Sequence, residues 1–110
     1  MVLQNCILYN TIYSMKTIHT TEVFDVWFAG LRDRQAAARI KIRIRRVEEG
    51  NFGDCEPVGE GVSEMRIHYG PGYRVYFAQR GMEVVILLAG GDKSTQFRDI
   101  KTALKLAQEL

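Results

Sequence analysis

The sequence has only two cysteines in 110 residues, Cys6 and Cys55. Two cysteines cannot build a disulfide framework, and their spacing matches no metal-binding motif, so we expect no metal and no cofactor. So few cysteines are typical of a reducing compartment, which favours a cytoplasmic protein. Residues 1–14 carry no basic stretch and no small-residue cleavage site, and this argues against a signal peptide.

Long hydrophobic runs are also missing, and none approaches the roughly 18–20 apolar residues of a membrane-spanning helix. The net charge is only +2, so total charge alone does not indicate binding to nucleic acid. The distribution of charge is more informative, because seven basic residues lie between positions 32 and 46 against a single acid, Asp33. Ten of the fifteen basic residues are arginine, whose planar guanidinium group suits two-point contacts with phosphate.

The length of the chain indicates a single domain with one core. Residues 1–14 are apolar but follow neither helical nor strand periodicity, and the first recognisable strand comes directly after Met15. We therefore predict an N-terminal extension over 1–14, dispensable for the fold, and one domain over 15–110. A short edge strand within 1–14 is the alternative.

Apolar spacing in the domain predicts an α+β fold in the order β-α-α-β-β-β-α. Phe24, Trp27 and Phe28 fall on one helical face and are expected in the core. The predicted elements are a strand over Lys16–Thr20, helices over Glu22–Leu31 and Arg34–Glu49 capped by Thr20 or Thr21 and by Asp33, a loop over Asn51–Gly61, strands over 62–69, 73–80 and 82–90, and a helix from Thr95. The small antiparallel sheet should pack one face against the helical hairpin and leave its other face partly open.

A hairpin around Pro71-Gly72 is the most informative part of the sequence. Strand alternation assigns a direction to each side chain. It directs Val75 and Phe77 into the core, and the polar side chains of both strands fall on the face that we expect to be open. The side chains gathered there are Arg66, His68, Arg74 and Tyr76, and the next strand ends near Lys93. This set of residue types suits a phosphodiester, although strand arginines can equally be solvated or salt-bridged, and His68 and Lys93 can be ordinary surface residues.

A basic stripe follows the second predicted helix, formed by Arg39, Arg43 and Arg46. Such a stripe is often a solvated helix face. It can also contact RNA or an acidic partner protein, and we carry these three residues as candidate RNA contacts together with Tyr76.

The segments NFGDCEPVGEGVSEMRIHYGPGYRVYF and LLAGGDKSTQFRDI resemble the addiction-module killer proteins of the RelE/HigB toxin superfamily. The resemblance rests on three motifs in a fixed order, E-x-R, G-Y-R-V-Y and G-G-D-K-S. It implies a RelE-like fold and a toxin of a type II toxin–antitoxin pair, which cuts messenger RNA on the ribosome without a metal. The partners implied are a small helix-turn-helix antitoxin, with which the toxin forms a hetero-oligomer, and the ribosome with its messenger.

The resemblance also implies roles for particular residues. The basic sheet residues of the family correspond to Arg66 and Arg74, and the basic residue after the last strand corresponds to Lys93. His68 stands where some relatives carry a lysine, and Phe97 is the nearest candidate for the aromatic residue that stacks on a base. Arginines would neutralise charge on the phosphorane, and His68 would act as acid or base. Lys93 would serve as a phosphate clamp or as an acid.

Two rival functions stay open. The same superfamily includes ParE-like toxins, which poison gyrase without a ribonuclease site, and an inactive domain could be retained for antitoxin binding alone. Converging cations on one sheet favour the ribonuclease, because a poison that only binds a protein has no need of them.

Overall fold

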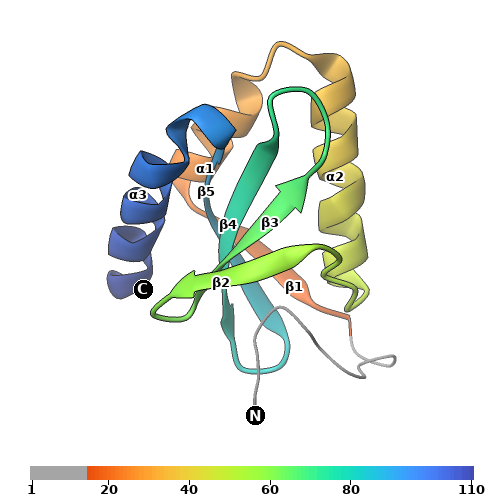
Figure 1. Cartoon of the computed structure of the whole chain (residues 1–110). Helices are drawn as coiled ribbons and strands as arrows, with labels where there is room; N and C mark the ends of the chain where they lie inside the picture. The colour runs from red at the N-terminus through yellow and green to blue at the C-terminus, as the bar shows by residue number, and fades with distance from the viewer. Residues whose placement is uncertain (1–14) are drawn as a thin grey trace.

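The computed structural model describes residues 15–110, and the predicted N-terminal extension lies outside the described residues. The fold is α+β, as predicted: a five-stranded sheet with helices on both faces (Figure 1). The elements are β1 (Thr17–Thr20), α1 (Glu22–Ala29), α2 (Arg34–Glu48), β2 (Cys55–Gly59), β3 (Val62–Ile67), β4 (Tyr73–Arg80), β5 (Val84–Asp92), the 3-10 turn η1 (Lys93–Thr95) and α3 (Gln96–Gln108). Strands lie in the order β1-β5-β4-β3-β2, with β1 parallel to β5 and all other pairs antiparallel.

The prediction of a loop over Asn51–Gly61 is wrong, because this segment contains strand β2. β2 pairs with β3 at the edge of the sheet, where Pro57 needs no ladder partner for its missing N–H group. Gly61 adopts φ +80° in the tight turn that follows, a conformation that few other residues accept. Glycine and proline, which suggested a loop, are here the residues of an edge strand and its turn.

Both helix caps predicted from the sequence are confirmed. The Thr21 hydroxyl accepts a hydrogen bond from the amide of Phe24 at 3.0 Å, at the start of α1. The Asp33 carboxylate accepts from the amides of Gln35 and Ala36, at 2.9 and 3.1 Å, at the start of α2. Each cap satisfies amides that the first helical turn leaves without partners.

Helices α1 and α2 cover one face of the sheet and enclose the larger core. Its buried members are Phe24, Ile40, Val47, Phe52, Met65, Ile67, Val75, Phe77, Val85 and Leu87. Trp27 and Phe28 are half-buried and pack against this core, which confirms their predicted structural role. The side-chain direction assigned to Val75 and Phe77 by alternation is also confirmed.

The sequence predicts a second face that is partly open, and the structure shows that α3 covers much of this face (Figure 1). A smaller core forms between α3 and the strands, with Val62, Tyr76, Ala78, Leu88, Ala89 and Ala103 as its buried members. The apolar face of α3 has to be removed from water, and the centre of β4 and β5 is the surface that it covers. No helix within residues 15–110 is long and apolar enough to cross a membrane.

Two consecutive glycines near the end of β5 face opposite sides of the sheet, as successive residues of a strand do, and they follow an irregularity in the pairing of β4 with β5. The register shifts by one residue beside Tyr76 and Phe77, as in a β-bulge. A Cβ atom on Gly90 would lie 2.2 Å from the Trp27 ring, and one on Gly91 would lie 1.8 Å from the Asp99 carboxylate. The helices on both faces therefore approach the backbone of β5 more closely than any side chain would allow.

Gly90→Ala should lower the free energy of unfolding by roughly 1–3 kcal/mol, because the added methyl group overlaps the Trp27 ring. Gly30→Ala is the matched control, since a Cβ there meets only Val26 and Trp27 carbonyl oxygens, at ordinary distances of 3.4 and 3.6 Å. Urea denaturation measures both changes. The double variant with Trp27→Leu should lose less than the sum of the single losses, and strictly additive losses would contradict the contact.

Candidate functional site

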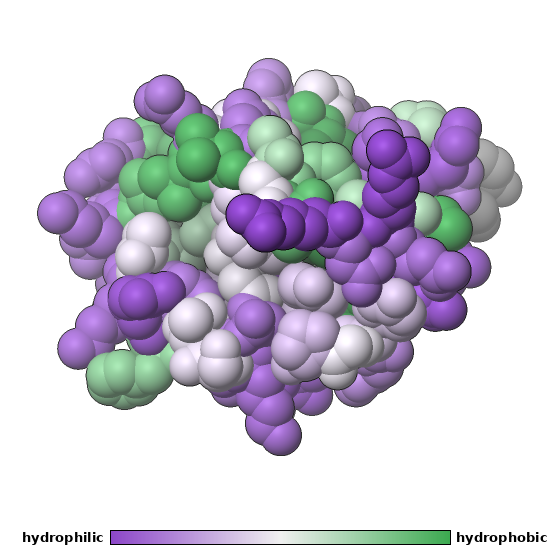
Figure 2. Space-filling view, turned by 90° about the horizontal axis from the view of Figure 1, so that it is seen from above, coloured by the Kyte–Doolittle hydropathy of each residue, from purple (hydrophilic) through white to green (hydrophobic). Residues whose placement is uncertain are grey.

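The described part of the chain has a hollow lined by residues of β3, β4, the turn between them and η1. The β3–β4 turn, η1 and the α1–α2 connection lie at the same end of the sheet (Figure 1). Figure 2 looks onto this end, where strongly hydrophilic side chains lie across a paler, less polar surface. The volume of the hollow is about 520 Å³, and its lining consists of Arg66, His68, Tyr69, Gly70, Pro71, Gly72, Arg74 and Lys93. The structure therefore brings together all four residues that the sequence proposed as catalytic.

Strand register and a tight turn bring these residues together. Arg66 on β3 lies directly opposite Arg74 on β4, so both side chains share one face. Gly72 in the connecting turn has φ +84°, and a Cβ there would lie 3.1 Å from Nη1 of Arg74 and 3.6 Å from Cβ of Lys93. Lys93 itself opens η1, directly after β5 ends at Asp92. The turn is thus packed closely against two of the cations.

Arg66 lies among three carboxylates. Its Nε is 3.2 Å from Glu64, its Nη1 is 3.9 Å from Asp54, and its Nη2 bonds to Glu56. The side chain is 31% exposed, and the surrounding acids offset its charge at the mouth of the hollow. Asp54 and Glu56 are not among the predicted site residues, because the sequence predicts a loop over their segment. That prediction does not place the segment beside β3.

Arg74 has fewer acidic partners. Its Nη1 donates to the carbonyl of Gly72 at 2.7 Å, and its Nε lies 3.6 Å from Glu64. Among the described residues that Nε has no hydrogen-bond partner, although it is buried. The side chain is 13% exposed and meets a single carboxylate, so more of its positive charge is available to an anion in the hollow.

Glu64 joins the two arginines. Its side chain is 2% exposed, and one carboxylate oxygen faces the Nε atoms of both Arg66 and Arg74. The other oxygen accepts a hydrogen bond of 2.7 Å from the side-chain amide of Gln96 on α3. A carboxylate this deeply buried is stable only when it is paired and hydrogen-bonded, and these three partners provide that environment.

His68 is exposed and pairs with Asp54, with 2.5 Å between Nε2 and the carboxylate. The hydrogen bond from His68, and then the charge of Arg66, lower the pKa of Asp54. A carboxylate with a lowered pKa stabilises the fold above its ordinary pKa and loses that contribution as the pH falls through the lowered value. A histidine oriented by a carboxylate is the arrangement that general acid–base catalysis commonly uses.

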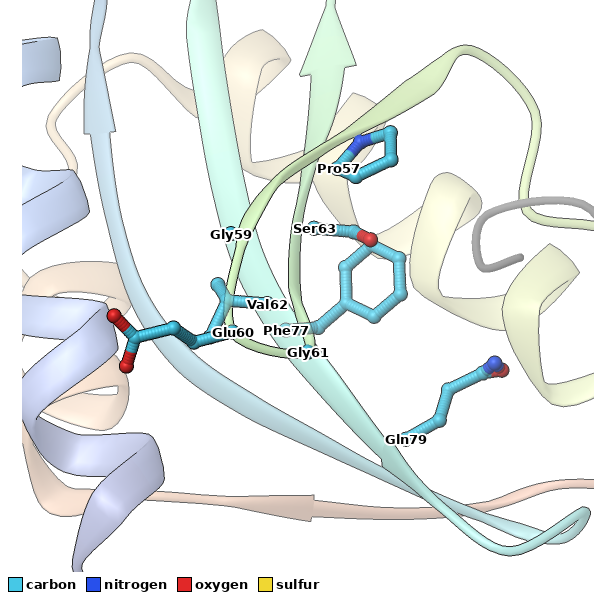
Figure 3. Close-up of a pocket in the computed structure, with 8 residues that line it drawn as sticks. All are labelled: Pro57, Gly59, Glu60, Gly61, Val62, Ser63, Phe77 and Gln79. Carbon is cyan, nitrogen blue, oxygen red and sulfur yellow. The ribbon is translucent and has the colours of Figure 1, made fainter. Parts of the chain in front are cut away.

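A second hollow, of about 300 Å³, lies between the β2–β3 hairpin and β4 (Figure 3). Ser63, Phe77 and Gln79 point to one side of the strands and Glu60 points to the other. Among the described residues its lining includes no arginine, lysine or histidine, so it offers no charge to a phosphate. None of the four residues predicted as catalytic lines this second hollow.

Residues 27–110 match the family described as phage derived protein Gp49-like (DUF891). The chain belongs to this family. An uncharacterized protein of Haemophilus influenzae is 53% identical over 93 residues, which cover 84% of this chain and 94% of that protein. No solved structure matches the chain. The Gp49-like family is of the toxin–antitoxin type, so an antitoxin is the partner that it suggests.

The basic stripe on α2 of this Gp49-like protein is not uniformly solvated. Arg43 turns inward, and its guanidinium group donates to the backbone carbonyls of Phe52, at 3.1 Å, Asp54, at 3.2 Å, and Arg66. Burial lowers its pKa, which the charge of Asp54 partly opposes. Arg43 thus fastens α2 to the segment before β2 and to the end of β3.

The other candidate RNA contacts have different surroundings. The guanidinium group of Arg39 lies 4.7 Å from the centre of the Tyr69 ring, beside the first hollow, and Arg46 is exposed. Tyr76 was expected on an open face, and that expectation is wrong, because α3 buries it completely. Burial, followed by the charge of Glu64, raises the pKa of Tyr76. Phe97, on the first turn of α3, is exposed with Lys101 over its ring.

Arg43→Lys should lower the free energy of unfolding by about 1.5–3 kcal/mol, because one ammonium group cannot replace a guanidinium that reaches three carbonyls. Arg46→Lys, on the exposed face of the same helix, should change it by less than about 0.5 kcal/mol. Urea midpoints compare the two variants. Equal midpoints would show that the contacts of Arg43 contribute nothing to the fold.

Proposed function

We propose that this protein is the toxin of a type II toxin–antitoxin pair and acts as a ribosome-dependent endoribonuclease of the RelE/HigB kind, cleaving messenger RNA without a metal. The observation that supports this function is the convergence of Arg66, His68, Arg74 and Lys93 on one accessible hollow. Membership of a family of toxin–antitoxin type supports it independently.

The proposed reaction uses the RNA's own 2′-hydroxyl as the nucleophile. His68, held by Asp54, takes the proton of that hydroxyl as its oxygen attacks the adjacent phosphorus. The bond from phosphorus to the 5′-oxygen then breaks, and Lys93 supplies the proton that this oxygen needs. The products are a 2′,3′-cyclic phosphate and a free 5′-hydroxyl.

Charge on the phosphorane is the main barrier that the site would have to lower. Arg74 is suited to this task, because the Gly72 carbonyl holds its guanidinium group and one carboxylate, that of Glu64, offsets its positive charge. Arg66 lines the same hollow, but three carboxylates offset its charge, so its proposed contact with phosphate is the weaker one. We assign the stronger contact to Arg74, with Lys93 beside it across the turn.

The ribosome would supply the remaining requirement, which is the alignment of the 2′-oxygen with the scissile bond. Positioning of this kind can account for a large part of a rate enhancement. Arg39 and Arg46 are the residues of the α2 stripe that we propose for contact with ribosomal RNA, since Arg43 is committed to backbone carbonyls. The proposed antitoxin partner is a small helix-turn-helix protein that holds the toxin in a hetero-oligomer between bursts of activity.

Expression of the chain without an antitoxin should stop growth and block translation. Primer extension on messengers from translating extracts should then reveal new 5′ ends within codons, because cleavage is expected on the ribosome. Intact messengers together with trapped gyrase–DNA breaks would favour the ParE-like function instead. Normal growth with a folded, abundant protein would favour a domain that only binds an antitoxin.

Arg74→Ala should reduce single-turnover cleavage on programmed ribosomes by roughly a hundred- to a thousandfold, about 3–4 kcal/mol of transition-state stabilisation. Arg74→Lys should restore only part of the rate, since a single ammonium cannot reproduce a planar fork. Arg80→Ala is the matched control, because Arg80 ends the same strand and bonds to the Ala107 carbonyl, away from the hollow. Cleavage at the parental rate by a folded Arg74→Ala protein would remove Arg74 from the site.

A further inference from the structure

A buried acid beside the proposed phosphate site is electrostatically unexpected. Glu64 lies under the two arginines of the hollow with its side chain 2% exposed. A negative charge in that place repels an incoming phosphate and offsets part of the positive charge that attracts it. Anion binding alone therefore does not account for Glu64, and its contacts indicate a different role.

Glu64 contacts the guanidinium groups of Arg66 and Arg74 at their Nε atoms. One oxygen faces the Nε atoms of Arg66 and Arg74, at 3.2 and 3.6 Å, on the side of each guanidinium nearest its own stem. Nη1 of Arg74 is held separately by the Gly72 carbonyl at 2.7 Å. For Arg74 the contact with Glu64 is an ion pair and not a hydrogen bond. Together with the hydrogen bond to the Gly72 carbonyl it favours one orientation of the planar group, so the donors that face the hollow require little reorganisation when a phosphate arrives.

Helix α3 fixes Glu64 in turn. Gln96, at the first position of α3, donates its side-chain amide to the second carboxylate oxygen at 2.7 Å. This hydrogen bond spans 32 positions of the sequence and connects the helix to the centre of the sheet. A chain of contacts thus runs from α3 through Glu64 to Arg74, and each of its members is half-buried or buried.

We propose that Glu64 is a positioning residue, which orients Arg74 for the phosphorane and is itself held by Gln96. Its kinetic consequence rests on the ribonuclease function proposed above, whereas its effect on the Arg74 side chain does not. Removing such a residue should have different effects on the affinity for RNA and on the rate of the chemical step. Loss of its charge leaves binding of the anionic RNA as tight or tighter, while loss of its orientation slows the chemical step.

Glu64→Gln should therefore reduce the single-turnover rate at saturating ribosomes by about 10- to 100-fold without raising the concentration needed for half saturation. Gln96→Ala should reduce the rate in the same direction while the charge of the site is unchanged. Glu83→Gln is the matched control, because it removes an equal charge from an exposed position before β5. Circular dichroism confirms the folding of each variant.

Nitrogen-15 NMR of the arginine side chains tests the positioning without any ribosome. The Nε–Hε signal of Arg74, assigned by its disappearance in Arg74→Lys, should shift toward that of a free arginine in Glu64→Gln and in Gln96→Ala. An unchanged Arg74 signal in both variants would overturn the proposal. If Glu64→Gln does not fold, Gln96→Ala decides alone, because it leaves the carboxylate in place.

The cleavage kinetics and the arginine NMR together distinguish a failure of the ribonuclease function from a failure of the positioning role. A wild-type protein that cleaves no messenger, but whose Arg74 signal depends on Glu64 and Gln96, would overturn the ribonuclease function and retain the positioning role. A cleaving protein whose Glu64→Gln variant only needs more ribosomes for half saturation, with an unchanged maximal rate, would overturn the positioning role and retain the ribonuclease function.

Discussion

The pairing of two arginines across β3 and β4 is the constraint on which the rest of this structure depends. Arg66 and Arg74 lie directly opposite each other, and like charges in that register are destabilising. Glu64, two residues earlier on β3, lies on the same face and places a counter-charge between them. The burial of that carboxylate strengthens its attraction for both arginines, and α3 adds a hydrogen bond to it through Gln96. Sheet register, helix docking and the hollow are therefore parts of one electrostatic arrangement.

Much of the fold could be predicted from the sequence, because its strongest signals are local. Thr21 and Asp33 cap their helices where the sequence indicated, and strand alternation assigned Val75 and Phe77 to the core. The signals that failed depend on neighbours distant in sequence. β2 carries glycine and proline and forms a strand only because β3 offers it a partner at the sheet edge. The burial of Tyr76 depends on where α3 docks, which the composition of β4 does not show.

The cations of the candidate site could be predicted from the sequence, whereas their acidic partners could not. Arg66, His68 and Arg74 belong to one hairpin, so alternation alone places them on one side, and the end of β5 brings Lys93 to them. The acids that partner these cations were missed, because Asp54 lies in the segment that was read as a loop. Arg43 was grouped with the solvated stripe, since helical spacing gives the face of a residue but not the carbonyls that it reaches.

The two arginines look alike in sequence, yet the structure makes them different. Among residues 15–110, Arg66 faces three carboxylates, whereas Arg74 meets only the one that both share, and Lys93 lies beside Arg74 across the turn. Positive potential in the hollow is therefore concentrated on the side of Arg74 and Lys93. The side of Arg66 is closer to neutral, and there His68 pairs with Asp54. Under the ribonuclease function proposed above, an RNA phosphate attracted to the side of Arg74 and Lys93 would place its neighbouring ribose toward His68. The unequal compensation of two similar arginines would then orient the substrate.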